Sequence, residues 1–189
     1  QVFVAPGNAG TARAPRLSNV ALNSIPELVV FAREQNIAFT VVGPEAPLAA
    51  GVVDAFRAAG LRIFGPTQYA AQLESSKDFA KAFMQRHGIP TAGYQTFTDA
   101  AAARAYVDGK GAPIVVAVTV AEAHAAIGDM LLGNTMGAAG ARVVIEDFLQ
   151  GEEASFIVMV DGEHVLAMAT SQDHKRLLDD DQGPNTGGM

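Results

Sequence analysis

The sequence predicts an α/β fold in two parts, a parallel-sheet domain followed by an α+β domain. Strand-like and helix-like segments alternate at short spacing through the first 65 residues, which is typical of parallel strands joined by helical crossovers. Later, two β-branched runs flank Asp161-Gly162, a dipeptide typical of tight turns between antiparallel strands. The change of pattern predicts a boundary near residue 73, with domains of residues 1–73 and 74–189.

The first domain is expected to contain three strands and two helices. The strands cover residues 2–4, 39–42 and 61–64. One helix begins after Ser24, because serine caps helix N-termini and Pro26 is tolerated in a first turn. A second helix runs from Gly51 to Gly60, since glycine is common at helix ends. Ligands of open α/β sheets bind beyond the carboxyl ends of the strands. Three turns lie there: Gly7-Asn8, Gly43-Pro44-Glu45 and Gly65-Pro66-Thr67.

The second domain is expected to begin with one long helix over residues 68–87, which Gly88 and Pro90 would end. Apolar and β-branched runs then predict three strands and one more helix. The strands cover residues 94–97, 113–116 and 142–146, and the helix covers residues 120–132. The hairpin strands follow at residues 154–160 and 163–168, with a two-residue type I′ turn.

Composition excludes several classes of function. The chain has 189 residues, with 13 Lys and Arg against 20 Asp and Glu, and a formal net charge of −7. Duplex nucleic acid needs clustered basic residues, so it is not an expected partner. No apolar run reaches the roughly 18 residues of a spanning helix, so no membrane partner is expected either. The absence of cysteine excludes a catalytic thiol and favours a cytoplasmic location.

Two clusters and one lysine carry candidate chemistry. The backbone N–H and C=O groups of residues 146–149 are suited to hydrogen bonds with the edge of a purine, and the Glu153 carboxylate is suited to a ribose hydroxyl. An acidic loop before a hairpin has the same sequence pattern. Residues 172–176 and the glycine-rich residues 183–188 suit an anionic substrate, or form a solvated loop. Lys77 either reaches a phosphate or is simply exposed. The histidines have no metal-ligand spacing, so no metal ligand is assigned.

Six motifs, in this order, give the chain a resemblance to a known family. They are residues 5–11 (APGNAGT), 42–48 (VGPEAPL), 63–67 (IFGPT), 151–156 (GEEASF), 172–176 (QDHKR) and 183–189 (GPNTGGM). Together they closely resemble the glycinamide ribonucleotide synthetases (phosphoribosylamine–glycine ligases), ATP-grasp enzymes of de novo purine biosynthesis. The resemblance covers essentially the whole chain.

This resemblance implies a partial Rossmann-like domain that binds phosphoribosylamine, followed by a partial α+β ATP-grasp domain. It implies ligation of glycine to 5-phosphoribosylamine through a glycyl phosphate, with ATP and Mg²⁺ (or Mn²⁺), by a monomer or weak dimer. Phosphorylation is needed because a carboxylate is a poor electrophile. Positioning and charge neutralisation are expected to supply most of the catalysis.

The resemblance also implies roles for individual residues. The nucleotide contacts would be Lys77 at the phosphates, Glu146, Asp147, Phe148 and Leu149 at adenine, and Glu153 at ribose. The phosphoribosylamine pocket would be lined by Gly7, Asn8, Gly43, Pro44, Glu45, Asp173, His174 and Lys175. The glycine and acyl-phosphate centre would hold Asn185, Thr186, Gly187 and Arg176.

The sequence departs from the family pattern in three places. Family members have an additional strand and turn before the position of Gln1, and further residues, including magnesium carboxylates, after that of Met189. They also have a lysine-containing lid loop after Val116, where this chain continues into Ala117. We expect that the molecule has this lid, because a direct join would give an extended run where the fold should reverse. The 189 residues alone are expected to be inactive.

Two other functions stay open. One is a different ATP-grasp carboxylate–amine ligase, although Lys175-Arg176 and the Gly-Pro-Glu turn favour a phosphorylated ribose. The other is a non-catalytic nucleotide-binding module, which would bind ATP without any response to glycine.

Overall fold

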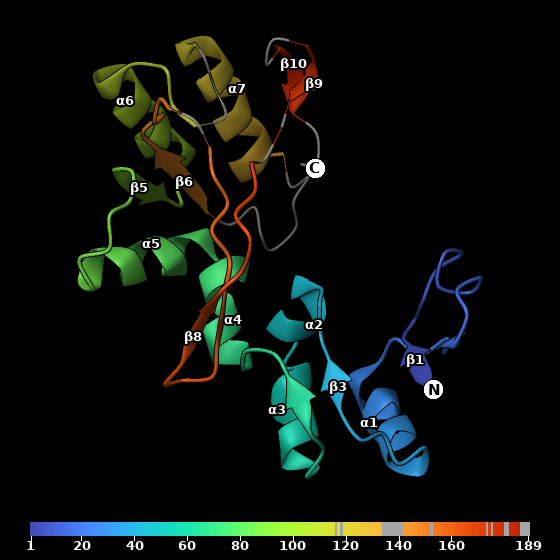
Figure 1. Cartoon of the computed structure of the whole chain (residues 1–189). Helices are drawn as coiled ribbons and strands as arrows, with labels where there is room; N and C mark the ends of the chain where they lie inside the picture. Colours follow the sequence, from blue (N-terminus) through green and yellow to red (C-terminus); the bar gives the residue numbers. More distant parts are fainter. Residues whose placement is uncertain are drawn as a thin grey trace. The chain divides into compact units, whose positions relative to one another are not determined.

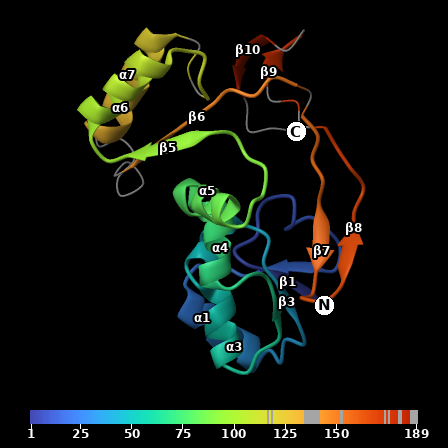
Figure 2. The ribbon, with the colours of Figure 1, turned by 90° about the vertical axis from the view of Figure 1, so that its left-hand side faces the viewer.

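The chain divides into two compact units, Gln1–Asp147 and Phe148–Met189, in the computed structural model. The structure describes residues 1–115, 117, 119–133, 142–151, 153–172, 174, 176–179 and 182–185, and at residues 176 and 182–185 it describes the backbone alone. Figures 1 and 2 show the helices and strands from two directions. None of the helices in these ranges is both long and apolar enough to cross a membrane.

The first part of the larger unit contains short parallel strands and three helices. The strands are β1 (Val2–Val4), β2 (Leu17–Asn19), β3 (Thr40–Val41) and β4 (Ile63–Phe64), and β1 pairs in parallel with β2, as β3 does with β4. The helices are α1 (Ile25–Glu34), α2 (Glu45–Ala49) and α3 (Val52–Ala58). Ala32 of α1 packs with Val53 and Phe56 of α3 in one buried core. The parallel pairing confirms the α/β prediction, but as two separate ladders, and β2 and α2 were not predicted.

The second part of this unit is built on an antiparallel strand pair. β5 (Tyr94–Phe97) pairs with β6 (Val143–Glu146) in a register that places Tyr94 opposite Glu146. Two helices, α6 (Ala100–Lys110) and α7 (Val120–Leu131), pack on the pair, and Val107 and Ile127 are buried between the layers (Figure 1). The sequence analysis did not predict α6, which Asp99 caps by accepting a hydrogen bond from the N–H of Ala102 at 2.8 Å.

The long helix expected over residues 68–87 is wrong, because the chain breaks it at Ser76. The structure has α4 (Gln68–Ser75) and α5 (Lys77–Arg86), and Ser76 between them is extended, with φ −136° and ψ 102°. The Ser76 hydroxyl accepts a hydrogen bond from the N–H of Phe79 at 3.3 Å, so this serine starts the second helix. Lys77 therefore becomes the first residue of α5 and not an interior helical residue.

The expected strand through residues 113–116 is also wrong over its described part, because Ile114 forms only isolated bridges and Val115 lies in a turn. Ile114 and Ala117 exchange two backbone hydrogen bonds, at 3.0 and 3.1 Å, so the chain reverses between them. Ile114 forms a single bridge to Asp147 beside the end of β6. The Cα distance between residues 116 and 117 lies outside the described residues.

The smaller unit contains two antiparallel strand pairs. β7 (Val158–Val160) and β8 (Val165–Ala167) run side by side (Figure 2), which confirms the hairpin. Val160 pairs with Val165, so the loop has four residues and the predicted two-residue type I′ turn is wrong. Asp161 fixes this loop, because its Oδ1 accepts hydrogen bonds from the N–H groups of Glu163 and His164, at 3.1 and 2.8 Å. β9 (Arg176–Leu178) pairs with β10 (Gln182–Asn185), which the sequence analysis expected as a glycine-rich loop.

Candidate functional site

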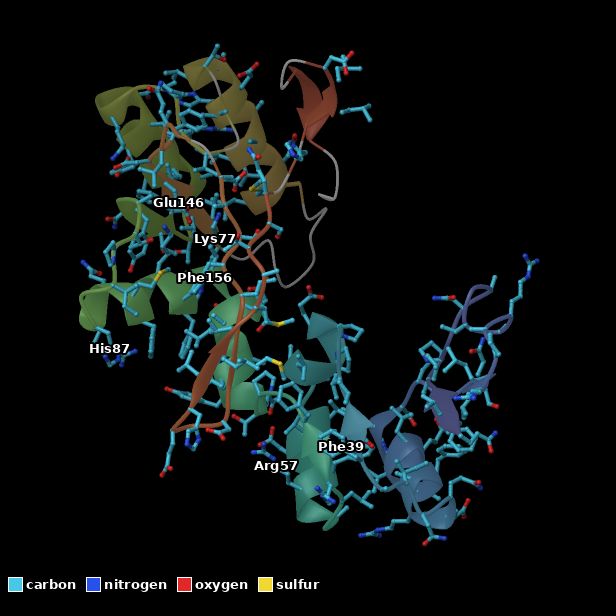
Figure 3. The ribbon with its side chains drawn as sticks, in the orientation of Figure 1. Phe39, Arg57, Lys77, His87, Glu146 and Phe156 are labelled. Atoms are coloured by element: carbon cyan, nitrogen blue, oxygen red, sulfur yellow. The ribbon has the colours of Figure 1, made fainter. Side chains whose placement is uncertain are left out.

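The buried carboxylate of Glu146 lies at the centre of the candidate site. Glu146 is the last residue of β6, and its side chain is only 8% exposed. Its Oε1 lies 3.2 Å from Nζ of Lys77, whose side chain is 56% exposed. The two labelled residues lie next to each other in Figure 3, one at the start of α5 and one at the end of β6. The structure thus brings together two of the residues predicted to bind nucleotide.

The N-terminus of α5 is held in place by its second residue, Asp78. One carboxylate oxygen of Asp78 accepts a hydrogen bond from Thr96 of β5 at 2.6 Å. The other oxygen lies 2.8 Å from Nη1 of Arg142, which directly precedes β6. These contacts tie the start of the helix to β5 and to the beginning of β6. They therefore fix the position of Lys77 relative to the two strands.

Asp147 follows Glu146 and ties the end of β6 to two other elements. Its backbone N–H donates to the carbonyl of Gly93 at 2.9 Å. Its carboxylate pairs with Lys110, the last residue of α6, at 2.5 Å. The carboxylate, and then the Tyr106 hydroxyl 3.2 Å away, raise the pKa of Lys110 above its usual 10.5. The Asp147 side chain and its backbone N–H therefore both have structural partners at the end of β6.

Gly7 and Asn8, predicted to bind substrate, form a loop that Asn19 locks. Nδ2 of Asn19 donates to the carbonyl of Asn8 at 2.9 Å, and Oδ1 of Asn19 accepts from the Thr11 hydroxyl at 2.7 Å. Oδ1 of Asn8 accepts from the N–H groups of Gly10 and Thr11, at 2.8 and 3.0 Å. Such a loop presents a rigid backbone surface just beyond the end of β1.

The turns that follow β3 and β4 meet at one cavity. Pro44 is extended, with φ −73° and ψ 150°, and leads from Gly43 into α2, where Glu45 is the first residue. A cavity of about 260 Å³ is lined by Glu45, by Pro66 from the turn after β4, and by Glu74 of α4, together with apolar side chains. The strand-end rule therefore located a hollow between two of the three expected turns.

The remaining predicted site residues belong to the smaller unit. Phe148, Leu149, Glu153 and His174 are exposed there. Arg176 in β9 and Asn185 in β10 are paired across the antiparallel ladder, so the structure places these two predicted catalytic residues opposite each other. Asp173, Lys175, Thr186 and Gly187 lie outside the described residues.

The sequence analysis missed Lys81, Asp78 and Asn19. Lys81 contacts the same carboxylate as Lys77, with Nζ 3.5 Å from Oε2 of Glu146. The i, i+4 spacing of the two lysines was a usable signal, because such residues share a helix face. Nothing in the sequence marked Asn19, which lies in a short strand that was not predicted.

No group of three or more His, Asp or Glu side chains comes together in a way that could hold a metal ion, within the part of the chain that the structure describes. We assign no metal ligand among the described residues and no chemical step to a metal.

Two family profiles together match the whole chain. Residues 1–74 match "Phosphoribosylglycinamide synthetase, N domain", and residues 75–189 match "Phosphoribosylglycinamide synthetase, ATP-grasp (A) domain". Curated phosphoribosylamine–glycine ligases are similar, with 72% identity in Neisseria meningitidis serogroup A over 201 residues and 64% in Escherichia coli K12 over 203 residues. Both matches cover 100% of this chain, and 48% and 47% of the relatives, so the chain spans about half of their length.

Solved structures show the same fold. The crystal structure of phosphoribosylamine–glycine ligase from Thermotoga maritima is 28% identical, with a TM-score of 0.73 over 97% of this chain and 47% of that one. D-alanyl-alanine synthetase A from Vibrio cholerae is 16% identical, with a TM-score of 0.56 over 72% of this chain and 45% of that one. The similarity to the Vibrio cholerae protein shows a shared fold and nothing about function.

Proposed function

The chain belongs to the phosphoribosylglycinamide synthetase family, and from this membership we propose that it carries the nucleotide- and phosphoribosylamine-binding parts of a phosphoribosylamine–glycine ligase. In the proposed reaction, a glycine carboxylate oxygen takes the γ-phosphoryl group of ATP, which gives glycyl phosphate and ADP. The amine nitrogen of 5-phosphoribosylamine then attacks the glycyl carbonyl carbon, and phosphate leaves. The product is glycinamide ribonucleotide, an intermediate of de novo purine biosynthesis.

The contact between Lys77 and Glu146 carries this proposal. Lys77 opens α5, where the backbone N–H groups and the helix dipole favour an anion. Glu146 begins the segment proposed to hold adenine, residues 146–149. An exposed ammonium group beside that segment is placed to exchange its carboxylate partner for a nucleotide phosphate.

The other predicted residues keep their proposed roles. Glu153 would bind ribose. Gly7, Asn8, Gly43, Pro44 and Glu45, with Asp173, His174 and Lys175, would bind phosphoribosylamine. Arg176, Asn185, Thr186 and Gly187 would act at the glycine and acyl-phosphate centre. Arg176 and Asn185 are paired across the ladder of β9 and β10, and this pairing supports assigning both residues to the glycine and acyl-phosphate centre.

ATP and Mg²⁺ (or Mn²⁺) are the proposed cofactors, and the metal would supply charge neutralisation at the phosphates. We propose a division into domains of residues 1–73 and 74–189, a cytoplasmic location, and a monomer or weak dimer without nucleic-acid or membrane partners. We also propose that these 189 residues alone bind ATP without completing ligation. Phosphate release from them that depends on both glycine and phosphoribosylamine would contradict this last point.

Calorimetric titration with ATP and Mg²⁺ tests the nucleotide site. We expect Lys77→Met to weaken ATP binding about 10- to 100-fold, because a hydrogen bond to a charged group contributes about 1.5–3 kcal/mol. Lys77→Arg keeps the cation and should lose much less affinity. If Lys77→Met binds ATP as tightly as the unchanged chain, the proposed phosphate contact is wrong.

Titration with ATP in the presence of glycine and a stable phosphoribosylamine analogue tests the substrates. We expect each of the two compounds to change the affinity for ATP, because all three would share one site. A response to a different carboxylate or amine alone would indicate another ATP-grasp ligase. ATP binding that is indifferent to glycine and to the analogue would indicate a non-catalytic module.

A further inference from the structure

Two lysines of one helix contact the same buried carboxylate in different surroundings. Lys77 and Lys81 lie one turn apart on α5, and their Nζ atoms lie 3.2 and 3.5 Å from the two oxygens of Glu146. The Lys77 side chain is 56% exposed, whereas those of Lys81 and Glu146 are 7% and 8% exposed. One cation thus faces solvent while the other is enclosed with the carboxylate.

Lys81 is fixed by further contacts inside the fold. Its Nζ donates to the Thr91 hydroxyl at 2.7 Å and to the carbonyl of Ala92 at 3.4 Å. The same atom lies 5.8 Å from the centre of the Tyr94 ring, in a cation–π arrangement. These partners satisfy the ammonium group where water does not reach, so Lys81 stays beside Glu146.

A buried carboxylate requires a permanent opposite charge, because removing one partner of a buried ion pair leaves an uncompensated charge. Lys77 cannot meet this requirement and also bind a nucleotide phosphate. We propose that Lys81 is the permanent counter-ion of Glu146, a positioning residue that leaves Lys77 free to exchange Glu146 for phosphate. Without Lys81, Lys77 would be the one cation left beside Glu146 among the described residues, and ATP would have to break that pair.

This inference rests on the proposed nucleotide site, and three variants test it by ATP titration in the presence of Mg²⁺. We expect Lys81→Met to weaken ATP binding at least about tenfold, since Glu146 then holds Lys77 more tightly. Glu146→Gln removes the carboxylate that competes with phosphate for Lys77. It serves as the reference for the double variant, because on its own it leaves the buried Lys81 ammonium without a carboxylate partner. The double variant Lys81→Met/Glu146→Gln should bind ATP within about threefold of Glu146→Gln alone, because no buried carboxylate is left to neutralise.

The rescue by the second substitution separates positioning from a merely structural role. If Lys81 only supported the packing of α5, the double variant would lose as much affinity as Lys81→Met, and the inference would be overturned. The double variant contains no buried ion pair, so it also serves if Lys81→Met alone does not fold. Arg86→Met, which removes an exposed cation from the other end of α5, is the matched control and should leave ATP affinity unchanged.

The same experiment distinguishes the inference from the proposed function. Lys81→Arg keeps the charge and should retain most of the affinity. If Lys77→Met weakens ATP binding but a folded Lys81→Met variant does not, the phosphate contact stands and the role of Lys81 is wrong. If the unchanged chain does not bind ATP, the proposed nucleotide site itself fails, and the inference fails with it.

Discussion

The side-chain amide of Asn19 lies directly against the α-carbon of Gly7, so that a Cβ atom at position 7 would overlap it. Gly7 also has φ +79°, a left-handed conformation that costs a residue with a Cβ atom about 1–2 kcal/mol. Together, strain and overlap predict that Gly7→Ala lowers the free energy of unfolding by about 2–4 kcal/mol. Urea unfolding followed by circular dichroism measures this loss.

Gly60→Ala provides the matched control for Gly7→Ala. Gly60 has a similar φ of +74°, but a Cβ atom there would meet open space. We therefore expect Gly60→Ala to cost only the backbone strain, about 1–2 kcal/mol. Equal losses in the two variants would show that the contact between Gly7 and Asn19 has no energetic weight.

Ser76 determines where α5 begins, and its substitution should affect both stability and the candidate site. Ser76→Ala removes the hydroxyl that caps the helix and introduces the residue with the highest helix propensity where the chain leaves the helix. We expect the free energy of unfolding to fall by about 1 kcal/mol. ATP should also bind more weakly, because Lys77 is the next residue.

Ser75→Ala, within α4, controls for the loss of a serine hydroxyl next to the break. We expect it to change the free energy of unfolding by less than about 0.5 kcal/mol and to leave ATP affinity unchanged. The proposed role of the Ser76 cap is wrong if both variants lose stability and affinity to the same extent.

The sequence was most informative where local chemistry and packing agree. The start of α1 at Ser24 and the hairpin around Asp161 were predictable, because a cap or a turn residue lies beside an apolar periodic segment. Ser76 was not, since a serine within a helical pattern fits both a helix interior and a cap, and only the tertiary contacts of Asp78 at the start of α5 decide between them. The role of Lys81 depends on burial against Glu146, which no local pattern reveals.

The register of the hairpin shows the same limit. Asp-Gly favours a two-residue turn, but the Asp161 side chain accepts hydrogen bonds from two backbone N–H groups and so closes a four-residue loop. The number of loop residues depends on whether the flanking strands pair up to a two-residue turn or stop at the four-residue loop that Asp161 closes. In the candidate site, likewise, the turns after β3 and β4 were predictable from topology, whereas the loop that Asn19 locks depended on an unpredicted strand.

The pair of Lys110 and Asp147 predicts a pH dependence in the alkaline range. Because the pKa of Lys110 is raised above 10.5 in the folded chain, the pair stabilises the fold fully below that value and loses its effect as pH rises through the raised pKa. Lys110→Met should therefore have a lower urea midpoint than the unchanged chain at neutral pH, and the difference should shrink in strongly alkaline solution. A difference that does not change with pH would contradict the assignment.

Asp161 predicts the opposite dependence in the acid range. The backbone N–H groups of His164, and then of Glu163, hold the pKa of the Asp161 carboxyl below its usual 3.8. The charged carboxylate therefore stabilises the loop above that value, and the effect is lost as pH falls through the lowered pKa. NMR titration of the Asp161 carboxyl carbon should give this low pKa, and Asp161→Asn should reduce amide protection at β7 and β8 near neutral pH but not in strong acid. Glu163→Gln keeps the backbone donor and should leave both the pKa of Asp161 and the amide protection unchanged. If this variant loses as much amide protection as Asp161→Asn, the charge of the loop, and not the hydrogen bonds of Asp161, stabilises the hairpin.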